Sequence, residues 1–240
     1  MTDRHGGVSQ APWDSMNLGD HVGDSPQSTQ VNRQRLHDTL GTRPVFLKQV
    51  HGVQSVLLDN ASEDGAEADA CISVAPGVAC TIMVADCLPV LMCDASGRWV
   101  AAAHAGWRGL AGDTGHGVLE ALLAASPLCD TEPDGILVWL GPCIGPQAFE
   151  VGAEVVAAFC DRDPAAAGLF KPLPNNKWLA DLAGLARLRL HSLGVTRVYG
   201  NDGDAAWCTV TQASTFFSHR RDSPVLGHSG RMAACIWLGS

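Results

Sequence analysis

Three short polar segments interrupt apolar stretches of this sequence, and each carries a side chain that binds transition metals well. They are QVHG with His51, ADCLP with Cys87 and HAGWRG with His104. Imidazole and thiolate are common zinc ligands, and three protein ligands leave a fourth tetrahedral position for water or substrate. An open position favours chemistry over a cross-linking role. A second interpretation stays open, because lone Cys and His side chains often pack as ordinary core residues.

The segments that must position these side chains look like buried strands. Residues 45–47, 78–84 and 99–103 are apolar runs, and each leads into one of the three metal-binding side chains. Sites in α/β and α+β proteins form where strand ends meet, from residues that are distant in sequence. We therefore expect the three strand ends to converge on one point.

The rest of the chain predicts a mixed arrangement of strands and helices. Residues 1–30 are rich in Gly, Asp, Ser and Pro and predict a loop-rich arm, and residues 161–174 predict a surface insertion. The apolar pattern predicts helices over residues 117–125, 152–160 and 179–193. Short apolar runs predict strands between residues 43 and 104 and over residues 136–140, 197–199 and 232–238.

Composition bounds the possible functions. The chain has 240 residues and 46% hydrophobic residues, enough for one compact domain or two tightly fused halves. A net charge of -9 without a basic block argues against nucleic acid or an anionic membrane as the main partner. An anionic substrate would therefore need a local positive cavity.

The sequence also bears on the cellular compartment. It has no apolar stretch of membrane-spanning length, and its first residues lack the apolar core of a signal peptide. Its nine cysteines are scattered, without a CxxC pair, which is typical of reduced and buried thiols. We expect a cytoplasmic protein, and the sequence leaves its oligomeric state open.

Several longer motifs resemble those of the YfiH family, also called laccase-domain or DUF152-type proteins. They are QVHG, EADA (residues 67–70), VADCLPVL (84–91), AAAHAGWRG (101–109), GPCIGPQAFEVG (141–152), FFSHRRD (216–222) and GRMAACIWL (230–238). The resemblance begins at RHGGVS (residues 4–9) and runs to the C-terminus, so it supports a single domain over residues 1–240. It implies an α+β fold of layered α/β/β/α type, and zinc binding by His51, Cys87 and His104.

The resemblance also implies purine nucleoside chemistry. Phosphorolysis of adenosine, inosine and methylthioadenosine needs a phosphate site, whereas deamination of adenosine needs an activated water. A nucleoside and phosphate are then the expected partners.

Arg108 and Asp86 are the candidate catalytic residues. Arg108 follows His104 in a segment flanked by glycines, where a guanidinium can pair with phosphate, although a structural clamp on a carbonyl is an equal alternative. Asp86 precedes Cys87, and either proton transfer or the fixing of an imidazole fits a carboxylate there, the second role being favoured. Cys143 is interpreted as a packing residue.

Other polar or aromatic residues of these motifs are candidates for substrate binding, with ordinary surface or core roles as the alternative. They are Lys48, Gln49, Trp107, Arg220 and Arg231. Three positions depart from the usual family pattern and bear on substrate preference: His219 where relatives have Tyr, Val210 after Cys-Thr, and a longer segment at residues 226–231.

Two rival functions follow from other names of the family. A copper polyphenol oxidase of the multicopper type needs clustered His residues, usually in HxH pairs, whereas the nine His here are scattered and form no HxH. Copper remains an alternative occupant of a single His, Cys, His site. The name peptidoglycan editing factor implies an accessory role, and a nucleoside panel beside a phenol oxidation test would separate these functions.

Overall fold

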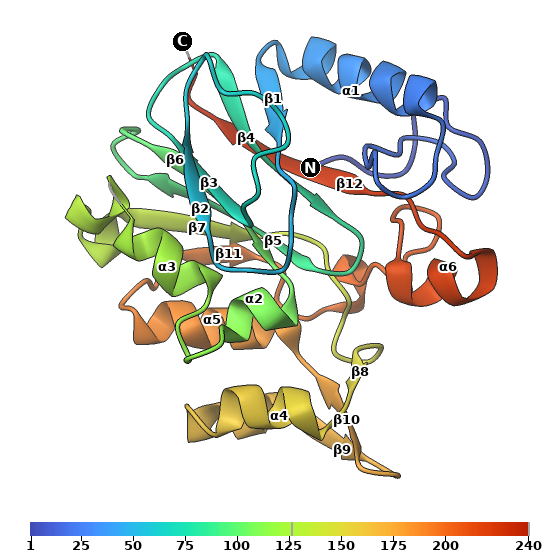
Figure 1. Ribbon diagram of the computed structural model, residues 1–240. Helices are drawn as coiled ribbons and strands as arrows, with labels where there is room; N and C mark the ends of the chain where they lie inside the picture. Colours follow the sequence, from blue (N-terminus) through green and yellow to red (C-terminus); the bar gives the residue numbers. More distant parts are fainter. Residues whose placement is uncertain (126, 240) are drawn as a thin grey trace.

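Two packed β-sheets lie at the centre of the computed structural model, and helices cover their outer faces (Figure 1). The structure describes residues 1–125 and 127–239. Within them the larger sheet has the order β11-β7-β5-β6-β3-β2, the second β1-β4-β12, and a small peripheral sheet β8-β10-β9.

The strands are β1 (Arg43–Phe46), β2 (Ser55–Leu58), β3 (Ala70–Ser73), β4 (Val78–Val84), β5 (Leu88–Asp94), β6 (Val100–Ala105), β7 (Ile136–Leu140), β8 (Glu150–Val151), β9 (Phe170–Leu173), β10 (Lys177–Ala180), β11 (Val198–Gly200) and β12 (Met232–Trp237). The α-helices are α1 (Pro26–Leu40), α2 (Trp107–Ala111), α3 (Val118–Ala124), α4 (Ala153–Cys160), α5 (Leu182–Ser192) and α6 (His219–Leu226). Short 3-10 turns are η1 (Leu128–Asp130), η2 (Pro133–Gly135), η3 (Pro164–Leu169) and η4 (Ala205–Trp207).

Successive side chains along each strand of the larger sheet point to opposite faces, and this produces a core layer on each side of the sheet. In β6, Ala101 and Ala103 pack with the helical layer, whereas Val100 and Ala102 face the second sheet. Both faces of the sheet are therefore buried, which is why its strands read as continuous apolar runs.

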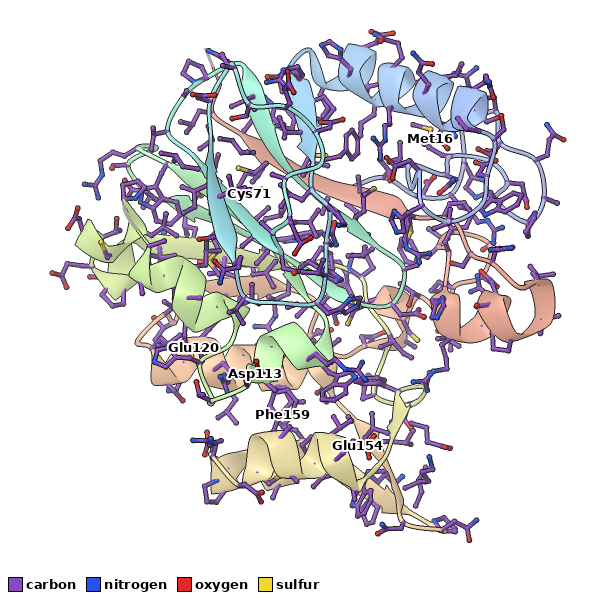
Figure 2. The ribbon with its side chains drawn as sticks, viewed as in Figure 1. Met16, Cys71, Asp113, Glu120, Glu154 and Phe159 are labelled. Atoms are coloured by element: carbon purple, nitrogen blue, oxygen red, sulfur yellow. The ribbon has the colours of Figure 1, made fainter. Side chains whose placement is uncertain are left out.

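The core has three parts, each marked by a labelled residue in Figure 2. Phe159 lies between α4 and α2, in the part of the core on the helical side of the larger sheet, and Cys71 lies between the two sheets. Met16 packs with Leu36 of α1 against the outer face of the second sheet. The α/β/β/α layering is thus confirmed.

Several expected elements are confirmed and one is displaced. The helices predicted at residues 117–125 and 152–160 are α3 and α4, and the strands predicted at 78–84 and 136–140 are β4 and β7. The third helix was predicted from residue 179, but it begins at Leu182, where Asp181 caps it by accepting a hydrogen bond from the Gly184 amide. Leu179 instead pairs with Lys171 in the peripheral sheet.

The predicted arm and insertion contain more regular secondary structure than expected. Helix α1 begins at Pro26, inside the predicted loop, with Ser25 as its N-cap. Its buried face is formed by Thr29, Asn32 and Leu36, so it lacks the apolar stripe that reveals a helix.

The predicted surface insertion contains η3 and β9, and it buries Ala166 and Phe170 in the core. Helix α6 was also absent from the prediction, and its N-cap is Ser218, which accepts from the amide of Arg221. Among the described residues, no helix has both the length and the apolar character needed to cross a membrane.

Candidate metal centre

His51, Cys87 and His104 meet in the structure. Their ligand atoms all lie within 4.8 Å of one another. The Cys87 Sγ is 3.7 Å from the His51 Nε2, and the two imidazole rings meet edge to face with centroids 4.7 Å apart. The geometry therefore brings the predicted trio together as a cluster that can hold a metal ion.

Each ligand comes from a different part of the two-sheet core. His51 lies in the loop after β1, and Cys87 lies in the turn that connects β4 to β5 and so links the two sheets. His104 was expected beyond a strand end, but it lies inside β6 and pairs with Pro89 of β5. The strand continues through His104 because Ala105 still pairs with Leu88.

Local backbone geometry allows the ligands to approach closely. His51 and Asp86 have φ values of 62° and 87°, in the left-handed region that non-glycine residues seldom adopt. A Cβ on Gly106 would lie 2.8 Å from the His51 Cδ2 and 3.1 Å from the Cys87 Sγ. Glycine at position 106 is therefore needed for this cluster to close.

Asp69 organises the centre, and the sequence analysis did not identify it. Its buried carboxylate accepts hydrogen bonds from the backbone amides of Val50, His51 and Gly52 at 3.1, 2.9 and 2.7 Å. It also lies 2.8 Å from the His104 Nδ1, which leaves the Nε2 of that ring to face the cluster. The only sequence signal was its place in the EADA motif.

Cys87 and His104 shift each other toward their charged forms. Burial alone would raise the pKa of the Cys87 thiol, but the neighbouring His104 and His51 outweigh burial and lower the pKa to about 6. Burial would lower the pKa of His104, but Cys87 and Asp69 raise it to about 9. Thiolate is the form of cysteine that ligates metals, so this environment favours ligation.

A cavity of about 430 Å³ opens beside the cluster, and two arginines give its lining positive charge. Arg108 and Arg231 line it together with His21 and His219, and Met83 supplies part of an apolar wall. A chain with net negative charge thus has a local cationic cavity at its candidate site.

The two arginines reach this cavity in different ways. Arg108 lies in helix α2, not in the turn expected from its flanking glycines, and its guanidinium stacks over the Trp107 ring at 4.4 Å. Arg231 is held by hydrogen bonds from its Nη1 to the carbonyl oxygens of Ser229 and Gly230. Its backbone amide donates to the Asn17 side chain, which ties the N-terminal arm to the cavity wall.

Two neighbouring candidates have different surroundings. The Gln49 amide donates to the Met83 carbonyl and accepts from the Met83 amide, so it fixes the loop before His51 onto β4 while lining the cavity. The Lys48 ammonium pairs with Glu67 at 3.0 Å on the surface. It lines an adjacent groove rather than the cavity beside the cluster.

Asp86 binds the C-terminal segment instead of an imidazole. Its two carboxylate oxygens accept from the Thr209 hydroxyl at 2.5 Å and from the Arg220 amide at 2.6 Å. The role of fixing an imidazole, which the sequence suggested for Asp86, belongs to Asp69 in the structure.

The remaining C-terminal arginines serve separate purposes. The Arg220 guanidinium donates to the Glu150 carbonyl and lies over the Phe149 ring. Arg221 pairs with Asp222 and donates to nearby carbonyl oxygens, so it clamps the C-terminal segment. Arg220 therefore lies beside the site, whereas Arg221 is a structural clamp.

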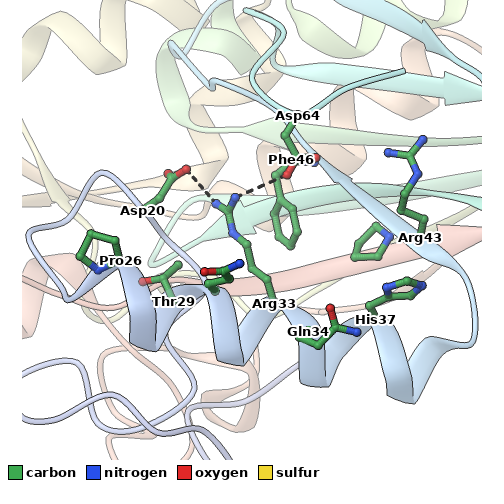
Figure 3. Close-up of a pocket in the computed structure, with 11 residues that line it drawn as sticks. Asp20, Pro26, Thr29, Arg33, Gln34, His37, Arg43, Phe46 and Asp64 are labelled. Atoms are coloured by element: carbon green, nitrogen blue, oxygen red, sulfur yellow. Dashed lines mark hydrogen bonds and ion pairs between the residues drawn. The ribbon is translucent and has the colours of Figure 1, made fainter. Parts of the chain in front are cut away.

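A further cavity, of about 360 Å³, lies between α1 and β1 and contains none of the predicted site residues (Figure 3). Arg33 crosses it, pairing with Asp20 at 3.2 Å and Asp64 at 3.5 Å while its guanidinium lies over the Phe46 ring. These contacts fasten α1 and the N-terminal arm to β1.

Together the fold and the site define a class: an α+β protein in which two packed sheets carry an open cluster of two imidazoles and a thiolate. Residues 1–239 match the family model described as multi-copper polyphenol oxidoreductase laccase. The chain therefore belongs to this family, the YfiH or laccase-domain family that its motifs resemble.

Similar proteins cover nearly the whole chain. A protein of Pseudomonas aeruginosa named purine nucleoside phosphorylase is 50% identical over 239 residues, which are 99% of this chain and 92% of that protein. Purine nucleoside phosphorylase YfiH of Escherichia coli strain K12 is 47% identical over 237 residues, covering 98% and 91%. The crystal structure of a DUF152 protein from Neisseria meningitidis has a TM-score of 0.91 and 46% identity, and the match covers 100% of this chain and 93% of that one.

Proposed function

We propose that this chain is a zinc-dependent purine nucleoside phosphorylase acting on adenosine, inosine and methylthioadenosine. The names of its relatives support the reaction class. One geometric observation carries the proposal: the cluster of His51, Cys87 and His104 opens into the cavity that Arg108 and Arg231 line.

The donor set fits zinc. Two imidazole nitrogens and one thiolate form a catalytic type of zinc site, and the lowered pKa of Cys87 favours the ligating form. When bound, zinc supplies a Lewis acid that polarises an oxygen of the substrate or of water. The same donors also accept copper, so metal identity is part of the test.

The two arginines in the cavity wall are suited to bind the phosphate that this reaction needs. In phosphorolysis a phosphate oxygen bonds to the sugar C1′ while the bond from C1′ to the base nitrogen breaks, its electron pair leaving with the base. We assign the phosphate to Arg108 and Arg231, because guanidinium pairs bidentately with phosphate oxygens. Lys48 lies outside this cavity and pairs with Glu67, so its ammonium is a weaker candidate.

We assign Asp86 a positioning role. Its hydrogen bonds to Thr209 and to the Arg220 amide fix the start of α6, and that fixes His219 beside the cluster. Gln49 likewise positions the loop of His51, and a contact with substrate would be additional to that role.

Deamination of adenosine is a second proposed activity of the same centre, because it needs an activated water but no phosphate. The proposal also includes a cytoplasmic location. All nine cysteines are free in the structure, as in proteins of reducing compartments.

The test measures ribose 1-phosphate and inosine separately from adenosine, with and without phosphate. Arg108→Lys is expected to lose phosphorolysis by a larger factor than deamination, because only the first reaction needs bidentate pairing with phosphate. Arg162→Lys, at an exposed position after α4, is the matched control. Equal loss of both activities would mean that Arg108 supports the architecture of the site. If the wild type forms neither product, the purine proposal fails.

The family description favours a copper oxidase as the rival function. Among the described residues, one group of three metal-ligating side chains is close enough to hold an ion, whereas a multicopper relay needs several. We therefore expect weak or absent phenol oxidation by the copper-loaded protein, measured beside the nucleoside assay.

A further inference from the structure

A second, smaller chamber adjoins the metal centre. It has a volume of about 170 Å³ and shares three lining residues, Ala85, Cys87 and His219, with the cationic cavity. The two chambers therefore meet at Cys87. Since pockets for whole drug-sized ligands start at roughly 300 Å³, the smaller chamber suits one part of a ligand.

The wall of the smaller chamber is more apolar than that of the larger one, although Asp86, His219 and Arg220 also line it. The smaller chamber is lined by Trp107, Ile144, Phe149 and Leu182, and three of these, all but Trp107, are buried in the protein core. Arg108 and Arg231 line only the larger chamber. A ligand that spans both would have an anionic part on one side of Cys87 and a flat apolar part on the other.

We propose that the smaller chamber binds the purine base of the nucleoside, with the ribose at the junction beside Cys87 and phosphate in the cationic cavity. This inference rests on the proposed function. Displacement at C1′ needs the attacking phosphate and the departing base on opposite sides of that carbon. As the new oxygen to carbon bond forms, the base nitrogen takes the electron pair of the broken bond, and the proton of hydrogen phosphate ends on the base.

A guanidinium group lies against each of the two aromatic side chains of the chamber. The Arg108 guanidinium lies 4.4 Å from the Trp107 ring centre, and the Arg220 guanidinium lies 5.7 Å from that of Phe149. Cation-π contacts of this kind orient the ring without covering its other face. The Arg108 contact also links the wall of the base chamber to the proposed phosphate site.

The chamber should recognise purines by stacking more than by hydrogen bonds. Both carboxylate oxygens of Asp86 already accept hydrogen bonds, from the Thr209 hydroxyl and the Arg220 amide, and the Arg220 guanidinium already donates to the Glu150 carbonyl. Stacking is tolerant of ring substituents because every base has a π face. Adenine and hypoxanthine should therefore bind with similar affinity, which would let one site take adenosine and inosine.

The experiment measures binding of free adenine and free hypoxanthine to the zinc-loaded protein without phosphate, by equilibrium dialysis. Trp107→Ala is expected to weaken both about 5- to 100-fold, because it removes a stacking face. Trp107→Phe should restore most of the affinity. Leu182→Phe, which fills the chamber, is expected to reduce binding similarly. The control is Trp237→Ala, at the end of β12 that pairs with Ala79, away from the site.

Steady-state kinetics give an independent readout. In Leu182→Phe the KM for adenosine should rise while the KM for phosphate and the zinc content stay unchanged, because Leu182 lines only the smaller chamber. Unchanged base affinity in both Trp107→Ala and Leu182→Phe would overturn the assignment, even if the wild type is an active phosphorylase. If the wild type binds free purines with the expected dependence on these residues but forms no ribose 1-phosphate, the proposed function fails and the base chamber stands.

Discussion

Replacing Asp69 with asparagine should damage both the fold and the metal centre. Each Asp69 carboxylate oxygen accepts two hydrogen bonds. One takes the His51 amide and the His104 Nδ1, and the other takes the amides of Val50 and Gly52. An asparagine side chain keeps one oxygen and replaces the other with an NH2 donor.

The expected loss of unfolding free energy follows from this arrangement of hydrogen bonds. Whichever way the new amide turns, its NH2 group faces two donors that have lost their acceptor. Each unsatisfied buried donor costs about 1–3 kcal/mol, so Asp69→Asn should lose about 2–6 kcal/mol of unfolding free energy. If His104 changes tautomer to accept from the NH2 group, its Nε2 carries the proton and cannot ligate.

Zinc affinity should therefore fall about 10- to 100-fold, the usual effect of removing a partner that orients a ligand. The assay is competition with a chromogenic chelator, beside urea unfolding of the metal-free protein. Asp94→Asn is the matched control, because Asp94 is also a buried carboxylate, but it binds Ser96 and Arg98 in the β5 to β6 turn.

The control should lose stability and keep its zinc affinity. Two results would refute the reasoning: wild-type zinc affinity in Asp69→Asn, or an equal loss of zinc in Asp94→Asn. The second would show that general destabilisation, and not the orientation of His104 and His51, controls the metal site.

Three other predictions test the site and the fold. The wild type should bind about one zinc per chain and Cys87→Ala almost none, by metal analysis, and undiminished zinc in the variant would exclude Cys87 as a ligand. Cys143→Ala should keep most activity, because burial raises the pKa of this thiol and its Sγ already accepts from Asn201; an inactive but folded and zinc-loaded variant would revive a cysteine nucleophile. Hydrogen bonds from Arg98 and Ser96 lower the pKa of Asp94 below its ordinary value, so the stability it contributes is present above about pH 4 and is lost as pH falls further. Urea unfolding at about pH 7 and about pH 3 should show the gap between wild type and Asp94→Asn shrinking in acid, and a constant gap would contradict this linkage.

The cluster of His51, Cys87 and His104 was predictable because its members follow, or lie within, strongly apolar strands. Such strands are visible in sequence, and His and Cys at their ends stand out. His104 shows the limit of the method, since only the pairing of Ala105 with Leu88 places it inside β6.

Asp69 and helix α1 escaped prediction for physical reasons. A single aspartate before a short strand has no spacing that identifies it, and its role appears only when β3 brings it beside the loop of His51. Helix α1 buries Asn32, whose amide bonds to Ser9, Ser15 and Asn17 in the arm. Polar contacts to distant segments hold this helix, and they leave no periodic apolar pattern.

The positions of the three ligands, one in the larger sheet and two in connections between the sheets, also bear on how the protein folds and unfolds. His51 follows a strand of the β1-β4-β12 sheet, His104 lies in the larger sheet, and Cys87 is in the connection between them. The full set of donors exists only after the two sheets have docked, so neither sheet alone could capture the ion with three ligands. A bound ion would hold the two sheets together and would therefore slow their separation during unfolding. The folding steps that precede docking of the sheets would keep the same rate with or without the ion.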